Sequence, residues 1–214
     1  MCWNAEVSLN TFAFSSFVLA LIIYNNQFTK YKIQELNDKW VYLFFASFIL
    51  MQLIEFFIWK NINNPFYNKI LSICATLLLC MQPAISIMIL KNIQLRNILL
   101  LSYLLIIIPY SMYNFMHKRI HTTVSSNGHL IWNFFYTNAF VWITWLFFLL
   151  FSHVYEKNWF GVIFGLITLF ISFIHYKNEN AMGSMWCWSI NFGMVYYAIY
   201  LLMYLPYLER GCVC

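Results

Sequence analysis

The sequence predicts an all-α integral membrane protein, a bundle of about seven transmembrane helices in a single domain spanning residues 1–214. Of its 214 residues, 63% are hydrophobic and only 9% are charged, whereas a soluble domain carries about 25% charged residues. A soluble fold of this size would lack enough polar side chains to cover its surface, but lipid can solvate the apolar outer faces of a helix bundle. The apolar residues also gather in seven runs that approach the roughly 20 residues needed to span a membrane.

Short polar loops separate the seven runs, and none of the runs shows the alternation typical of membrane β-strands. Tryptophan lies at both ends of the second run, as in the aromatic belt at a membrane surface. Pro109 predicts a kink or a stop near the end of the fourth run. The one long loop extends from Asn114 to Leu130, and the sixth run is the shortest. In order, the predicted helices are Val7–Tyr24, Trp40–Trp59, Ile70–Leu90, Asn97–Tyr113, Ile131–Phe151, Trp159–Ile174 and Ser184–Leu205.

The net charge of +5 comes almost wholly from residues between the apolar runs. These residues form no single basic stripe, which argues against nucleic acid as a partner and favours contact with the lipid bilayer. With the N-terminus outside, the inner loops hold seven of the 12 Lys and Arg residues and the outer loops hold five. This small asymmetry predicts an outer N-terminus and an inner C-terminus.

Glu55 is the one acidic residue well inside a predicted helix, and Gln52 precedes it by three residues on the same helical face. A charged side chain at mid-bilayer costs about 2.5–3.5 kcal/mol, so such residues usually face the bundle interior and carry function. The alternative is a position near the headgroups, because Trp59 is only about 6 Å further along the helix. If Glu55 faces the interior, we expect a neutral carboxyl group that is hydrogen-bonded to Gln52 or Gln82.

Small and polar residues recur every three or four positions in the third and seventh predicted helices. Such stripes mark faces that pack against other helices, or they line a hydrated path. In the third helix, Pro83 also leaves the carbonyl of Leu79 without its helical hydrogen-bond partner. The candidate interior polar site therefore comprises Glu55, Gln52, Gln82, Pro83, Ser86 and Asn191.

Three further motifs carry weaker signals. Gly161 and Gly165 form a GxxxG pattern that favours close packing within the chain, with helix-mediated self-association as the alternative. Cys212 and Cys214 are candidates for acylation beside the last predicted helix. His117 could share a metal with the histidine four residues on, but no acidic or cysteine partner is near in sequence, so we predict no metal site and no cofactor.

Five stretches of the chain carry a resemblance to a known family. They are MCWNAEVSLNTF, FILMQLIEFFIW, MQP, NGHLIW and GSMWCWSIN. Together they resemble an uncharacterised family of polytopic membrane proteins from giant DNA viruses and some protists, whose domain has no known function. The resemblance implies a viral origin, with a host endomembrane or the inner membrane of the virion as its location, and it implies no activity.

Three functions follow from these observations. The first is a small transporter or channel with a polar interior around Glu55 and Gln82; the Gln82–Pro83 pair weakly resembles, in reversed order, the Pro-Gln pair of PQ-loop transporters. The second is a structural or assembly protein of a viral or host-derived membrane. An enzyme that modifies lipids is the least favoured, because the sequence shows no nucleophile with a base near it.

Overall fold

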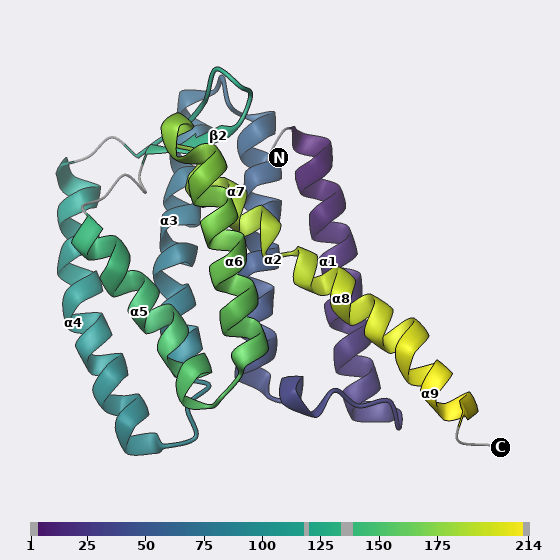
Figure 1. Cartoon of the computed structure of the whole chain (residues 1–214). Helices are drawn as coiled ribbons and strands as arrows, with labels where there is room; N and C mark the ends of the chain where they lie inside the picture. Colours follow the sequence, from purple (N-terminus) through teal and green to yellow (C-terminus); the bar gives the residue numbers. More distant parts are fainter. Residues whose placement is uncertain (1–3, 118–119, 134–138, 212–214) are drawn as a thin grey trace.

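A computed structural model describes residues 4–117, 120–133 and 139–211. Its helices run alternately in opposite directions (Figure 1). The start of α1 and a small β-hairpin lie at one end of the bundle, called the hairpin end below, and α9 extends away at the opposite end. The α-helices are α1 (Ala5–Phe28), α2 (Lys39–Lys60), α3 (Pro65–Ile87), α4 (Ile93–His117), α5 (Ala139–Tyr155), α6 (Trp159–Tyr176), α7 (Met182–Ser189), α8 (Phe192–Ile199) and α9 (Leu205–Gly211). The shorter elements are η1 (Gln34–Leu36), β1 (Thr122–Val124), β2 (Leu130–Trp132), η3 (Lys177–Glu179) and the π-helical turn η4 (Tyr200–Tyr204).

Six segments of the described chain are long and apolar enough to cross a bilayer. They are Ala5–Phe28, Lys39–Lys60, Pro65–Ile87, Ile93–His117, Trp159–Glu179 and Met182–Leu208. Helix α5 has 17 residues, about 25 Å at 1.5 Å per residue, against a hydrocarbon core of about 30 Å. The chain is thus an all-α, multi-pass membrane protein by the length and composition of its helices, and a seventh crossing by α5 stays a prediction.

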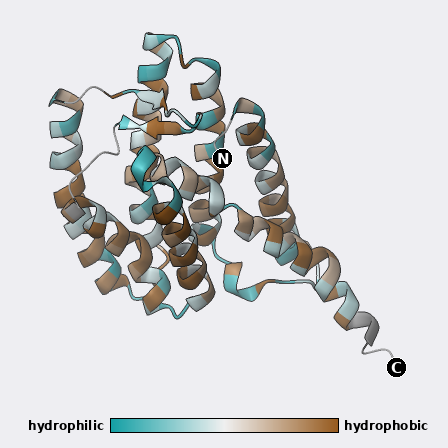
Figure 2. Cartoon of the chain, turned by 45° about the horizontal axis from the view of Figure 1, so that its top comes forward, coloured by the Kyte–Doolittle hydropathy of each residue, from teal (hydrophilic) through white to brown (hydrophobic). Residues whose placement is uncertain are grey.

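The outer faces of the helices are apolar. Figure 2 shows hydrophobic residues along most of the helical length and hydrophilic residues gathered in the connections. Large apolar side chains on the outer face of α6 are 43–63% exposed, namely Ile163, Leu166, Ile167 and Phe170. Lipid chains would cover these side chains, because a water-soluble protein rarely exposes so large a contiguous apolar surface.

The fifth predicted helix begins later than the sequence indicated. Ile131 lies in β2, which pairs antiparallel with β1, and the described helix α5 is Ala139–Tyr155. Leu130 and Trp132 are 0% and 3% exposed because they pack into the bundle as a strand. The pair Asn127-Gly128, with Gly128 at φ +80°, is a hairpin-turn signal that distinguishes this stretch from a helix.

The hairpin is fixed to α3 and α7 by polar contacts. The Asn68 amide of α3 donates to the Thr122 carbonyl at 2.9 Å and accepts from its N–H at 2.9 Å. The hydroxyls of Ser72 and Thr122 lie 2.8 Å apart, and the Ser184 hydroxyl of α7 donates to the Leu130 carbonyl at 2.8 Å. These bonds satisfy the strand groups that face the bundle, so the hairpin covers its interior at this end.

The seventh predicted helix, Ser184–Leu205, is broken. Helix α7 ends at Ser189 and α8 begins at Phe192, and α8 leans along α1 and away from the axis of α7 (Figure 1). At the break, the N–H groups of Gly193 and Met194 bond carbonyls three residues back, and the Asn191 amide donates to the Cys187 carbonyl at 2.8 Å. By contrast, the fourth helix does not stop at Pro109, since α4 continues to His117.

Candidate functional site

The interior face of α2 holds both polar residues that the sequence singled out on that helix. Glu55 and Gln52 are 0% exposed, so both side chains face the interior of the bundle. Glu55 lies within electrostatic reach of the Cys187 thiol on α7. The expected hydrogen bonds from Gln52 or Gln82 to Glu55 are not formed, because neither glutamine amide has a hydrogen-bond partner in the described part of the chain.

Gln82 lies at a different level of the bundle. It is 0% exposed, but it is 17 residues from the start of α3, whereas Gln52 is eight residues from the end of the antiparallel α2. At 1.5 Å per residue the two amides differ by about 13 Å in depth, which places Gln82 too far from Glu55 to bond it. The predicted residues therefore form two interior polar levels, Glu55 with Gln52 towards the hairpin end and Gln82 towards the opposite end.

An aromatic layer separates the two levels. Phe48 lies between Gln52 and Gln82 in depth, and its ring centroid is 6.5 Å from that of Trp186 on α7. Trp186 in turn contacts Trp145 of α5 at 5.9 Å. All three side chains are at most 6% exposed. In this conformation, close-packed rings occupy the interior between the two glutamines.

The glutamine amides are the unusual feature of this interior. All four polar atoms of Gln52 and Gln82 are buried and lack a hydrogen-bond partner among the described residues. A buried polar group left unsatisfied costs about 1–3 kcal/mol, and most such groups in proteins are satisfied by protein or ordered water. Two unsatisfied amides are therefore expensive in this state, and water or a polar solute would satisfy them.

Pro83 has the predicted effect on the backbone. The Leu79 carbonyl, four residues before it, accepts a hydrogen bond from the Trp145 indole at 2.9 Å. The neighbouring Cys80 carbonyl accepts from the Tyr103 hydroxyl at 2.6 Å. Side chains from α5 and α4 thus satisfy carbonyls beside the proline, and neither donor could be identified from the sequence.

Ser86 links α3 to α5. Its hydroxyl donates to the Leu149 carbonyl at 2.6 Å and lies 2.6 Å from the Ser152 hydroxyl. The two serines and this carbonyl satisfy one another within the packed interface. Ser86 therefore joins α3 to α5 in this conformation and does not bond either glutamine.

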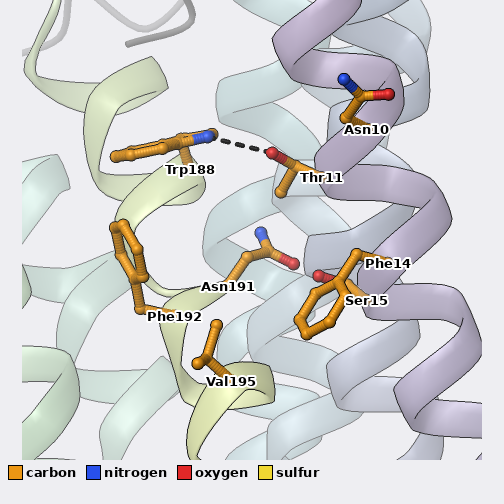
Figure 3. Close-up of a pocket in the computed structure, with 8 residues that line it drawn as sticks. All are labelled: Asn10, Thr11, Phe14, Ser15, Trp188, Asn191, Phe192 and Val195. Carbon is orange, nitrogen blue, oxygen red and sulfur yellow. Dashed lines mark hydrogen bonds between the residues drawn. The ribbon is translucent and has the colours of Figure 1, made fainter.

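Asn191 lines a groove between α1 and the α7–α8 break, away from the glutamines. Ser15 of α1 and Asn191 point towards each other across it, and the Trp188 indole donates to the Thr11 hydroxyl at 3.1 Å (Figure 3). No site residue was predicted on α1. The spacing of Ser8, Thr11 and Ser15 could have indicated one, because it places three hydroxyl side chains on one helical face.

Charged groups gather at the ends of the bundle. Lys91 and Glu156 form an ion pair of 3.8 Å at the end opposite the hairpin. In the hairpin, His129 lies 3.7 Å from Glu179 and packs edge-on against the Tyr176 ring. Burial lowers the pKa of His129, and the nearby Glu179 carboxylate partly opposes this shift.

The remaining motifs have separate positions. Gly161 and Gly165 line a cavity of about 60 Å³ beside His153 inside the chain, and self-association through them stays a prediction. Cys212 and Cys214 lie outside the described residues. Among the described residues, no group of three His, Cys, Asp or Glu side chains could hold a metal ion.

Comparison of the chain with protein-family models, with curated proteins and with solved structures finds no match.

Proposed function

We propose that this chain is a small membrane transporter or channel whose path runs along the α2–α3 interface, from Glu55 and Gln52 at one level to Gln82 at the other. One observation carries the proposal: the amides of Gln52 and Gln82 are fully buried and make no hydrogen bond to any residue that the structure describes. Such groups are costly in a protein that has a single closed conformation. A second conformation, in which water or solute reaches them, gives a reason for their presence.

The aromatic layer of Phe48, Trp145 and Trp186 is the gate in this proposal. Hydrophobic constrictions close pores by excluding water, and these rings lie between the two glutamine levels. The broken helix α7–α8 supports the same reading, because transporter sites are often built beside discontinuous helices. Trp186 belongs to α7, so a movement at the break would shift the gate directly.

Glu55 is the titratable group of the path. Its carboxyl group is fully buried at the level of Gln52, and intramembrane acids commonly carry protons in transporters. Glu55→Gln keeps the shape and polarity of a neutral acid, so the variant should fold while losing any proton-coupled flux. Glu55→Leu should in addition be destabilised, by about 1–3 kcal/mol, if its interior partners are left unsatisfied.

Cysteine accessibility tests the proposal. In a background whose six native cysteines are replaced, Gln52→Cys and Gln82→Cys are exposed to a membrane-impermeant methanethiosulfonate added on either side of the membrane. We expect position 52 to react from the hairpin side and position 82 from the other side. Met51→Cys and Ala75→Cys are matched controls, since both native side chains are 0% exposed; they should react only after denaturation.

Proton flux provides a second readout. In liposomes loaded with a pH-sensitive dye, Phe48→Ala should raise proton entry by thinning the gate, and Glu55→Gln in that background should reduce it again. The transport proposal fails if positions 52 and 82 are as protected as the two controls and Phe48→Ala admits no protons. A structural or assembly role would then be the better interpretation.

A further inference from the structure

A groove on the side of the bundle, separate from the α2–α3 path, has the character of a binding site. It lies between α1 and the α7–α8 break and has a volume of about 250 Å³ (Figure 3). Glu55, Gln52 and Gln82 do not line it. Its lining residues are Asn10, Thr11, Phe14, Ser15, Trp188, Asn191, Phe192 and Val195.

The floor of the groove is polar. Ser15 is 0% exposed, and its hydroxyl oxygen has no hydrogen-bond partner among the residues that the structure describes. Asn191, 6% exposed, faces it from the α7–α8 break (Figure 3). A buried hydroxyl without a partner costs free energy, and a ligand with hydrogen-bonding groups would remove that cost. The floor therefore favours a ligand whose oxygen atoms can form hydrogen bonds with Ser15 and Asn191.

The rim of the groove is apolar and exposed. Phe14, Phe192 and Val195 are 43%, 50% and 39% exposed, and they belong to segments long and apolar enough to span the bilayer. Ser15 is ten residues from the start of α1, about 15 Å along the helix and close to mid-bilayer depth. The groove thus opens sideways into the hydrocarbon region, and its ligand would enter from the lipid phase.

The lining excludes charged ligands. None of the eight lining residues is acidic or basic, so a phosphate group would have no cation to pair with and would be costly at this depth. A plain acyl chain would leave the Ser15 hydroxyl unsatisfied. We propose that the groove binds the uncharged head of a neutral lipid, in which a hydroxyl group and ester carbonyls meet Ser15 and Asn191, as in a diacylglycerol. This site is independent of the transport path proposed above.

Photolabelling in phosphatidylcholine liposomes tests the assignment. The probe is a diacylglycerol with a diazirine close to its head, and labelled peptides are located by mass spectrometry. We expect labels within residues 10–15 and 188–195, and we expect unlabelled diacylglycerol, but not additional phosphatidylcholine, to compete. Ser15→Ala should weaken this competition about 2–10-fold, the loss of one neutral hydrogen bond.

Ser8→Ala is the matched control, because Ser8 is also 0% exposed with an unpartnered hydroxyl on α1 but does not line the groove. It should leave labelling unchanged. Val195→Trp fills the groove without altering its floor and should abolish labelling even if Ser15→Ala folds poorly. Equal effects of Ser15→Ala and Ser8→Ala, equal competition by phosphatidylcholine, or labels confined to the outer faces of α4 and α6 would each overturn the proposal.

Discussion

Replacing Trp145 with phenylalanine removes the donor that satisfies the carbonyl beside Pro83. The Trp145 indole lies 2.9 Å from the Leu79 carbonyl oxygen, inside the bundle, and Trp145 is 6% exposed. Phenylalanine keeps an aromatic ring but has no N–H group. The Leu79 carbonyl, whose helical partner is absent because residue 83 is proline, would then be buried without a hydrogen bond.

The size of this effect can be isolated by a double-mutant cycle. Trp145→Phe alone loses the hydrogen bond and also weakens the ring contacts to Trp142 and Trp186 at 5.6 and 5.9 Å, and aromatic pairs contribute about 0.5–1.5 kcal/mol each. Pro83→Ala restores an N–H that can bond the Leu79 carbonyl within α3. In that background Trp145→Phe should still weaken the ring contacts but leave no carbonyl unsatisfied. The coupling energy between the two sites should therefore be about 0.6 kcal/mol, the average for hydrogen bonds between membrane helices, and at most about 1.7 kcal/mol.

The assay is reversible unfolding of the four members of the cycle in mixed micelles. Unfolding is monitored by the loss of helical circular dichroism in the far ultraviolet, because tryptophan fluorescence would differ between variants with and without Trp145. We expect Trp145→Phe to lower the free energy of unfolding more when residue 83 is proline than when it is replaced by alanine. If Trp145→Phe costs the same in both backgrounds, the indole is not the partner of the Leu79 carbonyl and the reasoning fails.

Three further predictions rest on other described residues. Gln82→Met removes two unsatisfied polar atoms while keeping the length of the side chain, so it should raise the free energy of unfolding by about 1–3 kcal/mol; a loss of stability in the same micelle assay would contradict this. Thr122→Val removes the hydroxyl that lies 2.8 Å from Ser72 and should lower stability by about 0.5–1.5 kcal/mol, seen as faster proteolysis of the hairpin. Because burial lowers the pKa of folded His129 below its ordinary value of 6.5, the unfolded state takes up the proton first, and stability should fall as the pH drops below 6.5. Thermal unfolding at pH 7.5 and 5.5 should show a smaller drop for His129→Gln and a larger one for Glu179→Gln.

The sequence predicted the features that depend on composition and helical spacing. A membrane bundle follows from the apolar runs, and the inward face of α3 follows from spacing, since Ser72 and Gln82 are both 0% exposed. Depth was harder to predict, because the register between antiparallel helices is set by where each helix begins. Helix α3 starts at Pro65 rather than Ile70, which moves Gln82 towards one end and away from Glu55. The family resemblance, the viral origin and the orientation stay predictions.

Contacts between residues far apart in the chain could not be predicted from the sequence, for a physical reason. A hydrogen bond such as that from Trp145 to Leu79 spans 66 residues; Pro83 marks the Leu79 carbonyl as lacking a helical partner, but nothing near Trp145 in sequence identifies its indole as the donor. The hairpin was missed because Leu130, Ile131 and Trp132 continue an apolar run, and only Asn127-Gly128 distinguishes a strand there from the start of a helix.

The anchoring of the hairpin sets an order for the biogenesis of the protein. Asn68 bonds Thr122, which is 54 residues later, and Leu130 bonds Ser184, which is another 54 residues later. At about 5–20 residues per second of synthesis, each partner emerges roughly 3–11 s after the group it satisfies. During the first interval Asn68 and Ser72 lack their bonds to Thr122, and during the second the Leu130 carbonyl lacks the bond from Ser184. Chains that stall between α3 and α7 would thus expose polar groups at the membrane to quality-control proteases and chaperones, and the arrival of Ser184 completes the anchoring of the hairpin.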